Sequence, residues 1–248
     1  MPKSKLKIVV IDVDETLGYF AQFGMFCHAL DSYFHDQNYH YNHFNQLLDL
    51  FPNLLRPNIL TILQFLLHKK EKGICHGIMI YTNNQGPKPW VEHIKSYFEH
   101  KLGKKVFDQV IAAFKVNGKI IEVCRTTDKK TYEDLLNCIK LPNNVEVCFL
   151  DDQLHPEMEH DNVYYINLKP YIFSMSFDSM IQSFLQSSLA NSINKDDFQQ
   201  KMKIYLNNYH YIASPKSQKE QDIDVIISKK IIDHLKEFFS NFSGSKNK

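Results

Sequence analysis

Short, continuously apolar runs alternate with longer amphipathic stretches along this chain of 248 residues. Runs of about six residues that are rich in valine and isoleucine are typical of strands that a parallel sheet buries on both faces. Four segments fit this description: LKIVVID from residue 6, ICHGIMIYT from residue 74, NNVEVCFLDD from residue 143 and NVYYINL from residue 162. A further pair of strands is predicted within residues 110–125, joined by the tight turn Asn117-Gly118.

Helical spacing of apolar residues predicts helices between and after these strands. The first spans about residues 56–73, with Pro57 in its first turn and Gly73 at its end. Residues 17–55, rich in aromatic side chains and histidine, are predicted to form helices and loops outside the sheet. Further helices are predicted at residues 88–102, at 130–140, from Phe173 to about Tyr211 and, after a polar linker at 213–222, at 223–239.

The alternation of strands and helices predicts the fold class. It is typical of an α/β protein in which helices cover both faces of a mainly parallel, doubly wound sheet, giving three layers. We expect residues 1–173 to form this core, with residues 17–55 as a helical insertion after the first strand. Residues 174–248 are expected to form a helical C-terminal extension.

Composition and charge exclude several classes of protein. Hydrophobic residues make up 44% of the chain, so we expect a packed core rather than a disordered chain. A net charge of +1 gives no general attraction for nucleic acid, and no apolar run is long enough to cross a membrane. The N-terminal residues have no signal-peptide pattern. We therefore expect an intracellular protein, cytoplasmic or nuclear, with no membrane partner.

The five cysteines are scattered along the chain and form no CxxC pair. This spacing predicts neither a disulfide framework nor a structural zinc site, and it favours a reducing compartment. We expect most of the cysteines to be small buried side chains, Cys148 in particular.

Polar side chains gather where three of the predicted strands end. In open parallel sheets ligands bind beyond the carboxyl ends of the strands, so we expect these side chains to lie along one edge. They are Asp12 and Asp14 after the first strand, Thr82 and Asn83 after the second, and Asp151 and Asp152 after the third. Four carboxylates close together need a cation, and a set of oxygen ligands favours Mg²⁺ over Zn²⁺. We therefore predict that all four aspartates bind Mg²⁺ in a site for phosphoryl chemistry.

The positions of these residues relative to the strand ends suggest chemical roles. Asp12, directly after the strand, is predicted to be the nucleophile that attacks phosphorus and forms an aspartyl-phosphate. Asp14 is predicted to protonate the leaving oxygen and then to activate water. Thr82 and Asn83 are predicted to bind the phosphoryl oxygens, and a lysine is needed to neutralise the transferring group.

Three short motifs at the strand ends resemble those of the haloacid dehalogenase superfamily: DVDET at residues 12–16, YT at 81–82 and FLDD at 149–152. Other segments are similar to those of its FCP/SCP group, the NLI-interacting-factor-like phosphatases that act on the C-terminal domain of RNA polymerase II. These segments are LRPNILTILQFL, YEDLLNCIKL and NVYYINLKPY, in the family order over roughly residues 6–173. The resemblance implies a Rossmann-like phosphatase core that uses Mg²⁺ and acts on serine/threonine phosphoproteins.

The sequence departs from the family pattern at three places. The family's catalytic lysine falls on Glu133, and we predict Lys130, one helical turn earlier, as its replacement in preference to Lys129. The segment TNNQG after the second strand is instead similar to small-molecule and polynucleotide phosphatases of the same superfamily. The insertion at residues 17–55 is longer and more aromatic than the group pattern implies, so the substrate class stays open.

Three functions are consistent with these features. The first is a phosphatase of serine/threonine phosphoproteins, and the second keeps the chemistry but acts on a nucleotide, a sugar phosphate or a nucleic-acid end. The third is a catalytically weak scaffold that binds a phosphorylated partner, which the displaced lysine and the unmatched residues 174–248 favour. Some aromatic residues fit an apolar wall for a peptide substrate as well as a helix packing on the core: Tyr19, Phe20, Phe23 and Phe26.

Overall fold

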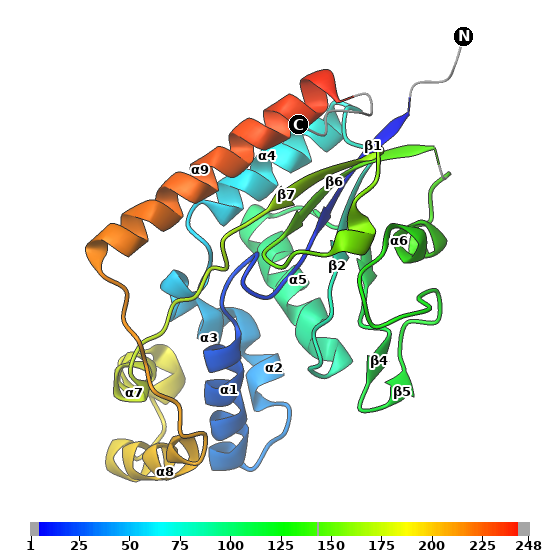
Figure 1. Ribbon diagram of the computed structural model, residues 1–248. Coiled ribbons are helices and arrows are strands. Elements are labelled where there is room, and N and C mark those ends of the chain that lie inside the picture. Colours follow the sequence, from blue (N-terminus) through cyan, green and yellow to red (C-terminus); the bar gives the residue numbers. More distant parts are fainter. Residues whose placement is uncertain (1–4, 143, 243–248) are drawn as a thin grey trace.

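The computed structural model describes residues 5–142 and 144–242, and a parallel sheet lies at its centre. The sheet has five strands in the order β3-β2-β1-β6-β7, and each pair of neighbours is parallel (Figure 1). The prediction of an α/β protein with a mainly parallel sheet is confirmed, and the strand order is that of a Rossmann-like sheet. The strands are β1 (Leu6–Ile11), β2 (Gly77–Tyr81), β3 (Gln109–Ile111), β6 (Val145–Asp151) and β7 (Val163–Asn167).

Alternate residues of the central strand β1 belong to two different cores. Val9 and Ile11 face one core, and Ile8 and Val10 face the other. Successive side chains of a strand point to opposite faces, so burial of both faces requires the unbroken apolar run seen in the sequence. The sheet is therefore a middle layer with helices on both sides (Figure 1). The first core lies under α4 (Ile59–Glu71), α5 (Lys88–Leu102) and α9 (Gln218–Asn241), and the second under α6 (Tyr132–Cys138).

The segment predicted as a pair of strands over residues 110–125 divides between two sheets. Its first residues belong to β3, which pairs with β2 at the edge of the main sheet. The turn Asn117-Gly118 joins β4 (Lys115–Val116) to β5 (Lys119–Ile120), as predicted, with φ angles of 51° and 76°. Both angles lie in the left-handed region that a tight hairpin turn requires. The extent of the first predicted strand was wrong, because the chain returns from α5 to the edge of β2 before the hairpin begins.

Helix α4 begins later than the sequence predicts. Its N-cap, Asn58, has a left-handed φ of 59°, so Pro57 precedes the helix instead of lying in its first turn. At the other end Gly73, with a φ of 67°, follows the helix as predicted. Helix α5 has the bounds that its apolar spacing predicts.

Residues 17–55 form a helical insertion outside the sheet, as predicted. Its two ends meet, because the Tyr19 N–H donates to Leu54 O at 2.7 Å and Gly18 pairs with Leu55. A Cβ at Gly18 would lie 2.6 Å from Leu54 O, so this close approach requires glycine. The insertion contains α1 (Ala21–Phe34), α2 (Tyr39–Asn42), α3 (Phe44–Asp49) and the 3₁₀ turn η1 (Pro52–Leu54).

The C-terminal extension is divided into more helices than predicted, and the continuous helix expected up to Tyr211 is wrong. The side chains of Ser187 and Asn194 accept backbone N–H groups where new helical segments start, and these local bonds interrupt the predicted helix. A capping box of Ser217 and Glu220 starts α9 inside the predicted linker. The elements before α9 are α7 (Phe177–Leu185), the 3₁₀ turn η3 (Ser188–Ala190) and α8 (Lys195–Asn207).

The extension packs against both the insertion and the sheet. The Phe198 ring of α8 lies 4.8 Å from the Tyr33 ring of α1, whereas Lys7 of β1 donates to Phe238 O of α9 at 2.6 Å. In Figure 1, α9 runs beside α4 along one face of the sheet. Helix α9 has 24 residues, yet neither it nor any other helix in the described ranges is apolar enough along its length to cross a membrane.

Candidate active site

The predicted site residues lie at the carboxyl edge of the sheet, where the strand order reverses between β1 and β6. Strand β1 leads to Asp12, whose N–H donates to Leu150 O at 2.9 Å, and β6 ends in Asp151. Strand β2, on the other side of β1, leads to Thr82. Such a point of reversal is where open α/β sheets bind ligands. A cavity of about 250 Å³ opens there, lined by every predicted site residue except Asp152 and also by Glu15, Asn84, Gln85, Gln153 and His155.

Lys130 is the buried cation of this edge. Its Nζ donates to Asp12 Oδ1 at 2.5 Å and to Asp151 Oδ2 at 2.6 Å, and only 2% of the side chain is exposed. The alternative residue, Lys129, is exposed and pairs with Glu157 at 2.5 Å. The structure therefore places Lys130 in the site and Lys129 outside it.

Burial dominates the electrostatics of this charged group. It raises the pKa of Asp12 to about 7 against the opposing attraction of Lys130, and Asp151 adds to the rise. Burial also acts to raise the pKa of Asp151, but His155 and Lys130 outweigh it and hold that pKa below its ordinary value. Burial would lower the pKa of Lys130, but the two aspartates outweigh this effect and raise it. One lysine thus faces two buried carboxylates, and the excess of negative charge favours a further cation.

Asp14 has a different partner from Asp12. Asn84 donates through Nδ2 to Asp14 Oδ2 at 2.7 Å. Burial raises the pKa of Asp14, and the bond from Asn84 offsets part of the rise. A raised pKa keeps more of the carboxyl group protonated, as a general acid requires. Asn84, which the sequence pattern does not single out, is the residue that orients this acid.

Three of the four predicted metal ligands form a group that can hold a cation. Side-chain oxygens of Asp12, Asp151 and Asp152 all lie within 4.8 Å of one another, and among the described residues Asp14 does not belong to this group. Burial, with a smaller contribution from Asp151, raises the pKa of Asp152, whose Oδ1 accepts a bond from Thr16 Oγ1 at 3.1 Å. The donors are all oxygens, which fits Mg²⁺ better than Zn²⁺. A cation here would also offset the charge that burial disfavours.

Thr82 and Asn83 line the cavity in different ways. Thr82 Oγ1 accepts the Asn84 N–H at 3.1 Å, so this hydroxyl holds the turn after β2 as well as lining the cavity. Asn83 Oδ1 is buried and has no hydrogen-bond partner among the described residues. Buried polar groups are nearly always paired, so this amide oxygen is open to a hydrogen bond from a donor that enters the cavity.

His155 lines the site although its sequence context does not mark it as functional. Its Nε2 lies 3.3 Å from Asp151 Oδ2 but is not aligned for a hydrogen bond. Within the described ranges this buried nitrogen has no other partner. The one signal in the sequence is its position four residues after the strand-end Asp151.

A loop, not a helix, brings Lys130 to the site. Helix α6 begins only at Tyr132, after the N-cap Thr131. The helical spacing from Glu133 that favoured Lys130 is therefore not the physical reason for its position, and the extent predicted for this helix was wrong at its start.

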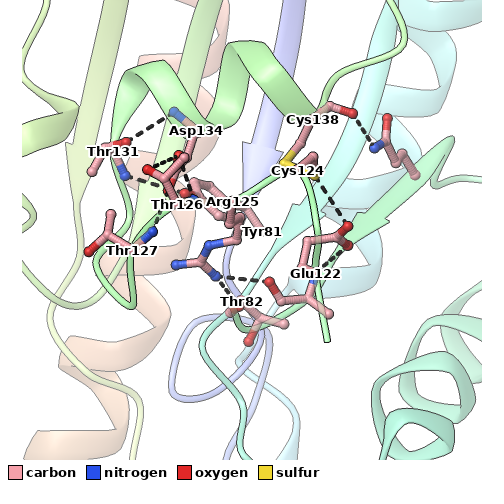
Figure 2. The surroundings of a disulfide bond; sticks show 12 residues. Tyr81, Thr82, Glu122, Cys124, Arg125, Thr126, Thr127, Thr131, Asp134 and Cys138 are labelled. Atoms are coloured by element: carbon pink, nitrogen blue, oxygen red, sulfur yellow. Dashed lines mark hydrogen bonds between the residues drawn. A yellow bond between two sulfur atoms is a disulfide. The ribbon is translucent and has the colours of Figure 1, made fainter. Parts of the chain in front are cut away.

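Arg125 fixes the loop that carries Lys130. It is 2% exposed and donates to Thr82 O at 3.2 Å and to Lys129 O at 3.0 Å. Its guanidinium also lies 4.8 Å from the centre of the Tyr81 ring. Figure 2 shows Arg125 between the end of β2 and the loop before α6. The sequence assigns no role to this arginine, and the structure makes it a positioning residue.

A disulfide between Cys124 and Cys138 closes the chain around the same loop (Figure 2). The two cysteines are 14 residues apart, and the segment between them carries Arg125 and Lys130. The scattered spacing predicts no disulfide framework and does not reveal this one bridge, because a single bridge between distant cysteines leaves no local sequence pattern. Disulfides are rare in reducing compartments, so the bridge removes the support that the cysteine spacing gave to the expectation of such a compartment. The remaining cysteines are free and buried, as predicted: Cys27, Cys75 and Cys148.

Arg56 fixes the loop on the other side of the site. It is 1% exposed and donates to Glu15 O at 2.6 Å, to Thr16 O at 2.6 Å and to Lys169 O at 3.0 Å. These bonds tie the loop that carries Asp14 to the segment that follows β7. The two buried arginines therefore hold the two loops that flank the cavity.

Comparisons of this chain with protein-family models, with curated proteins and with solved structures found no match. A functional assignment therefore depends on the residues and the geometry of the site.

Proposed function

We propose that the protein is a Mg²⁺-dependent phosphatase that hydrolyses phosphomonoesters through an aspartyl-phosphate on Asp12. The observation that carries this proposal is the buried contact of Lys130 with Asp12 and Asp151 beside the cavity at the sheet edge. A nucleophile paired with a buried cation, and a second acid two residues away, are groups that phosphoryl transfer needs. The motif resemblance supports membership in the haloacid dehalogenase superfamily as part of the same proposal.

In the first step Asp12 attacks the phosphorus atom, and the bond between phosphorus and the ester oxygen breaks. Lys130 donates to Asp12 Oδ1, so Oδ2 is the oxygen that forms the new bond. Asp14 in its protonated form gives its proton to the departing oxygen, and the alcohol leaves neutral. The Thr82 hydroxyl and the Asn83 side-chain Nδ2 donate to the phosphoryl oxygens at the turn after β2.

In the second step a water molecule attacks the phosphorus of the aspartyl-phosphate. Asp14, now ionised, accepts a proton from this water, and the bond between phosphorus and Asp12 breaks. The products are inorganic phosphate and the original carboxylate. The bond from Asn84 keeps Asp14 oriented in both steps, and the proton that Asp14 loses in the first step is recovered in the second.

The residues that would hold Mg²⁺ are Asp12, Asp151 and Asp152. When bound, the ion neutralises charge on the phosphoryl oxygens and so stabilises the transition state. Thr16 orients Asp152 through its hydroxyl, and Arg56 keeps Thr16 in place through the backbone. Two buried polar atoms that line the cavity without a hydrogen-bond partner among the described residues, Asn83 Oδ1 and His155 Nε2, also support a ligand there.

Two substrate classes have separate support. The motif resemblance favours a serine/threonine phosphoprotein, as in the FCP/SCP group. The contact between Asn84 and Asp14 favours a small phosphate ester such as a nucleotide, because Asn84 belongs to the TNNQG segment that departs from the group pattern.

The test is to trap the intermediate. We expect the wild-type protein with Mg²⁺ and an aryl phosphate to carry one phosphoryl group on the peptide that contains Asp12 after an acid quench, as measured by mass spectrometry. Chelation of Mg²⁺ and the Asp12→Asn variant should both abolish the label and the turnover. A protein that binds the phosphate ester but never turns it over would be a scaffold, and the proposal would be rejected.

A further inference from the structure

A second cavity, of about 500 Å³, opens directly beside the first. Asp14, Glu15 and Asn84 line both, so the two cavities meet at the proposed general acid. When a phosphoryl group occupies the smaller cavity, the oxygen that leaves faces Asp14, and the rest of the substrate extends into the larger cavity. The larger cavity is therefore where the leaving group is recognised.

Aromatic rings form the middle of the second cavity. They come from both sides of it, since some belong to the insertion and one belongs to α5. Flat apolar walls favour a planar ligand that can stack on them. The rings are those of Tyr19 and Phe20 before α1 and Trp90 of α5, and the ring of Tyr41 of α2 lies toward the far end, 3.8 Å from the His40 ring.

Trp90 is a rigid part of this wall. Its ring lies 5.7 Å from that of Phe23 and 5.6 Å from that of Phe44, and only 8% of the residue is exposed. Gly24 of α1 also lines the cavity, and a Cβ there would lie 3.7 Å from the Trp90 ring, an ordinary contact distance. The absence of a side chain at Gly24 therefore keeps the space beside Trp90 open.

Polar side chains line the far end of the cavity, away from Asp14. His28, Asp31 and His40 lie at this end, because they also line a third cavity to which Asp14 does not contribute. The Nδ1 atom of His28 bonds to Tyr209 Oη at 2.5 Å, and that of His40 bonds to Asp31 Oδ2 at 2.6 Å. These bonds hold both rings through Nδ1, and within the described residues neither Nε2 atom has a hydrogen-bond partner, so both can bind a ligand.

The two cavities together present a fixed order of chemistry. The cationic and acidic phosphoryl site comes first, then the polar side chains of Glu15 and Asn84, then the rings of Tyr19, Phe20 and Trp90, and last the histidine nitrogens beside Tyr41. A nucleoside monophosphate carries a phosphate, sugar hydroxyls, a planar base and the polar edge of that base in the same order. A peptide main chain fits this order less well, because its N–H and C=O groups would be unpaired against aromatic walls. A sugar phosphate would leave the rings uncovered.

We propose that nucleoside monophosphates are the substrate class, with the base stacked in the aromatic cavity beside Trp90 and the ester oxygen at Asp14. This inference rests on the proposed phosphatase function and adds the identity of the leaving group.

Two matched substrates test the contribution of the base. Adenosine 5′-monophosphate and ribose 5-phosphate have the same ester bond and differ by the base. Stacking of one base on an aromatic side chain gives about tenfold or more in binding, so we expect kcat/KM for the nucleotide to be at least about tenfold higher. A ratio near one for every common nucleoside 5′- and 3′-monophosphate would overturn the inference. A serine-phosphorylated peptide that is hydrolysed faster than any nucleotide would also overturn it.

Substitutions at Gly24 locate the base. Gly24→Leu fills the space beside Trp90, and we expect it to bring the ratio between the nucleotide and ribose 5-phosphate close to one. The matched variant Gly24→Ala adds only one methyl group and should keep most of the preference. A Gly24→Leu protein that keeps the full ratio would show that the base binds elsewhere, and the inference would be rejected.

A binding measurement separates this inference from the phosphatase proposal. Trp90 is the only tryptophan of the chain, so its fluorescence reports occupancy of the cavity. Adenosine, which carries no phosphate, should quench this fluorescence in the wild-type protein and in Asp12→Asn.

Quenching without turnover of any phosphate ester would support the base site and reject the phosphatase. Turnover of ribose 5-phosphate with neither quenching nor a base preference would reject the base site and support the phosphatase. The substrate comparison and the quenching measurement both use the wild-type protein, so they test the inference even if Gly24→Leu does not fold.

Discussion

The carboxyl edge of the sheet and the insertion at residues 17–55 are held together by different interactions. The edge holds charged groups in short bonds, such as Lys130 to Asp12 at 2.5 Å. The insertion is held by aromatic packing, with ring centres 5.5 Å apart for Phe23 and Phe44. Charge interactions in a buried site depend strongly on distance, whereas apolar cores of conserved volume tolerate changes of shape. The edge is therefore suited to fixing a reaction, and the insertion to varying what is bound.

Asp12→Asn tests the edge with the largest expected effect. Loss of the nucleophile should lower kcat by at least about 10⁴-fold, as for other enzymes that act through a covalent intermediate. The fold should be unchanged by circular dichroism, and Asp161→Asn, at an exposed position, serves as the matched control. A variant that keeps about a hundredth of wild-type kcat would contradict the role of Asp12.

Lys130→Met and Lys129→Met compare two neighbouring lysines in opposite environments. Removal of the buried Lys130 leaves Asp12 and Asp151 without their cation, and we expect the free energy of unfolding in chelator to fall by about 3–5 kcal/mol. Lys129→Met at the surface should change it by about 0.5 kcal/mol or less. Urea unfolding measures both, and added Mg²⁺ should reduce the loss for Lys130→Met. Equal effects of the two substitutions would be inconsistent with the buried cluster.

Phe26→Ala tests the insertion without touching the edge. The ring is fully buried and packs against Phe51 at 5.4 Å, so its removal should lower the free energy of unfolding by about 3 kcal/mol. Below the melting temperature, kcat for ribose 5-phosphate should stay within about threefold of wild type, because the charged edge is unchanged. A folded variant whose kcat falls by more than about tenfold would show that the two regions are not independent.

Reduction of the Cys124–Cys138 bridge tests the loop that carries Lys130. A bridge that closes a loop of this length stabilises the folded state by about 3 kcal/mol when it acts by restricting the unfolded chain. Reduction with a dithiol should therefore lower the free energy of unfolding by about that amount or less. The double variant Cys124→Ser, Cys138→Ser should be less stable in the same way and insensitive to the dithiol. A double variant that still responds would mean that another group is being reduced.

Asn84→Ala affects the place where the two regions meet, and its effect should be the smallest. Loss of the bond to Asp14 should lower kcat for alkyl phosphates by about tenfold. Aryl phosphates, whose leaving group needs little protonation, should lose less. Equal losses for both kinds of ester would argue against Asn84 acting through the general acid.

The residues at the strand ends could be predicted because the topology alone brings them together. Strands β1, β2 and β6 are parallel neighbours, so Asp12, Thr82 and Asp151 must share an edge whatever the details of the loops. Asn84 could not be chosen over Asn83, because the turn after β2 decides which amide points to Asp14. Periodicity carries no information about such a turn.

Other features depend on contacts between distant parts of the chain, and no local pattern encodes them. The bridge between Cys124 and Cys138 forms because α6 and the loop before it pack together. The helical spacing that predicts Lys130 is absent, because α6 begins only at Tyr132, and the bond from Arg125 to Lys129 O holds the loop that carries Lys130. The predicted helix after Phe173 failed because capping side chains such as Asn194 outweigh apolar spacing.

The disulfide also changes what happens when the chain is cut. Residues 124–138 form a covalent ring, and the exposed Lys129 lies within it. A protease that cleaves after Lys129 therefore opens the ring without dividing the molecule. The pieces 1–129 and 130–248 would migrate as one band on a gel without reductant and as two bands with it. Asp12 would then belong to one polypeptide and Lys130 to another, joined covalently only through a pair of sulfur atoms.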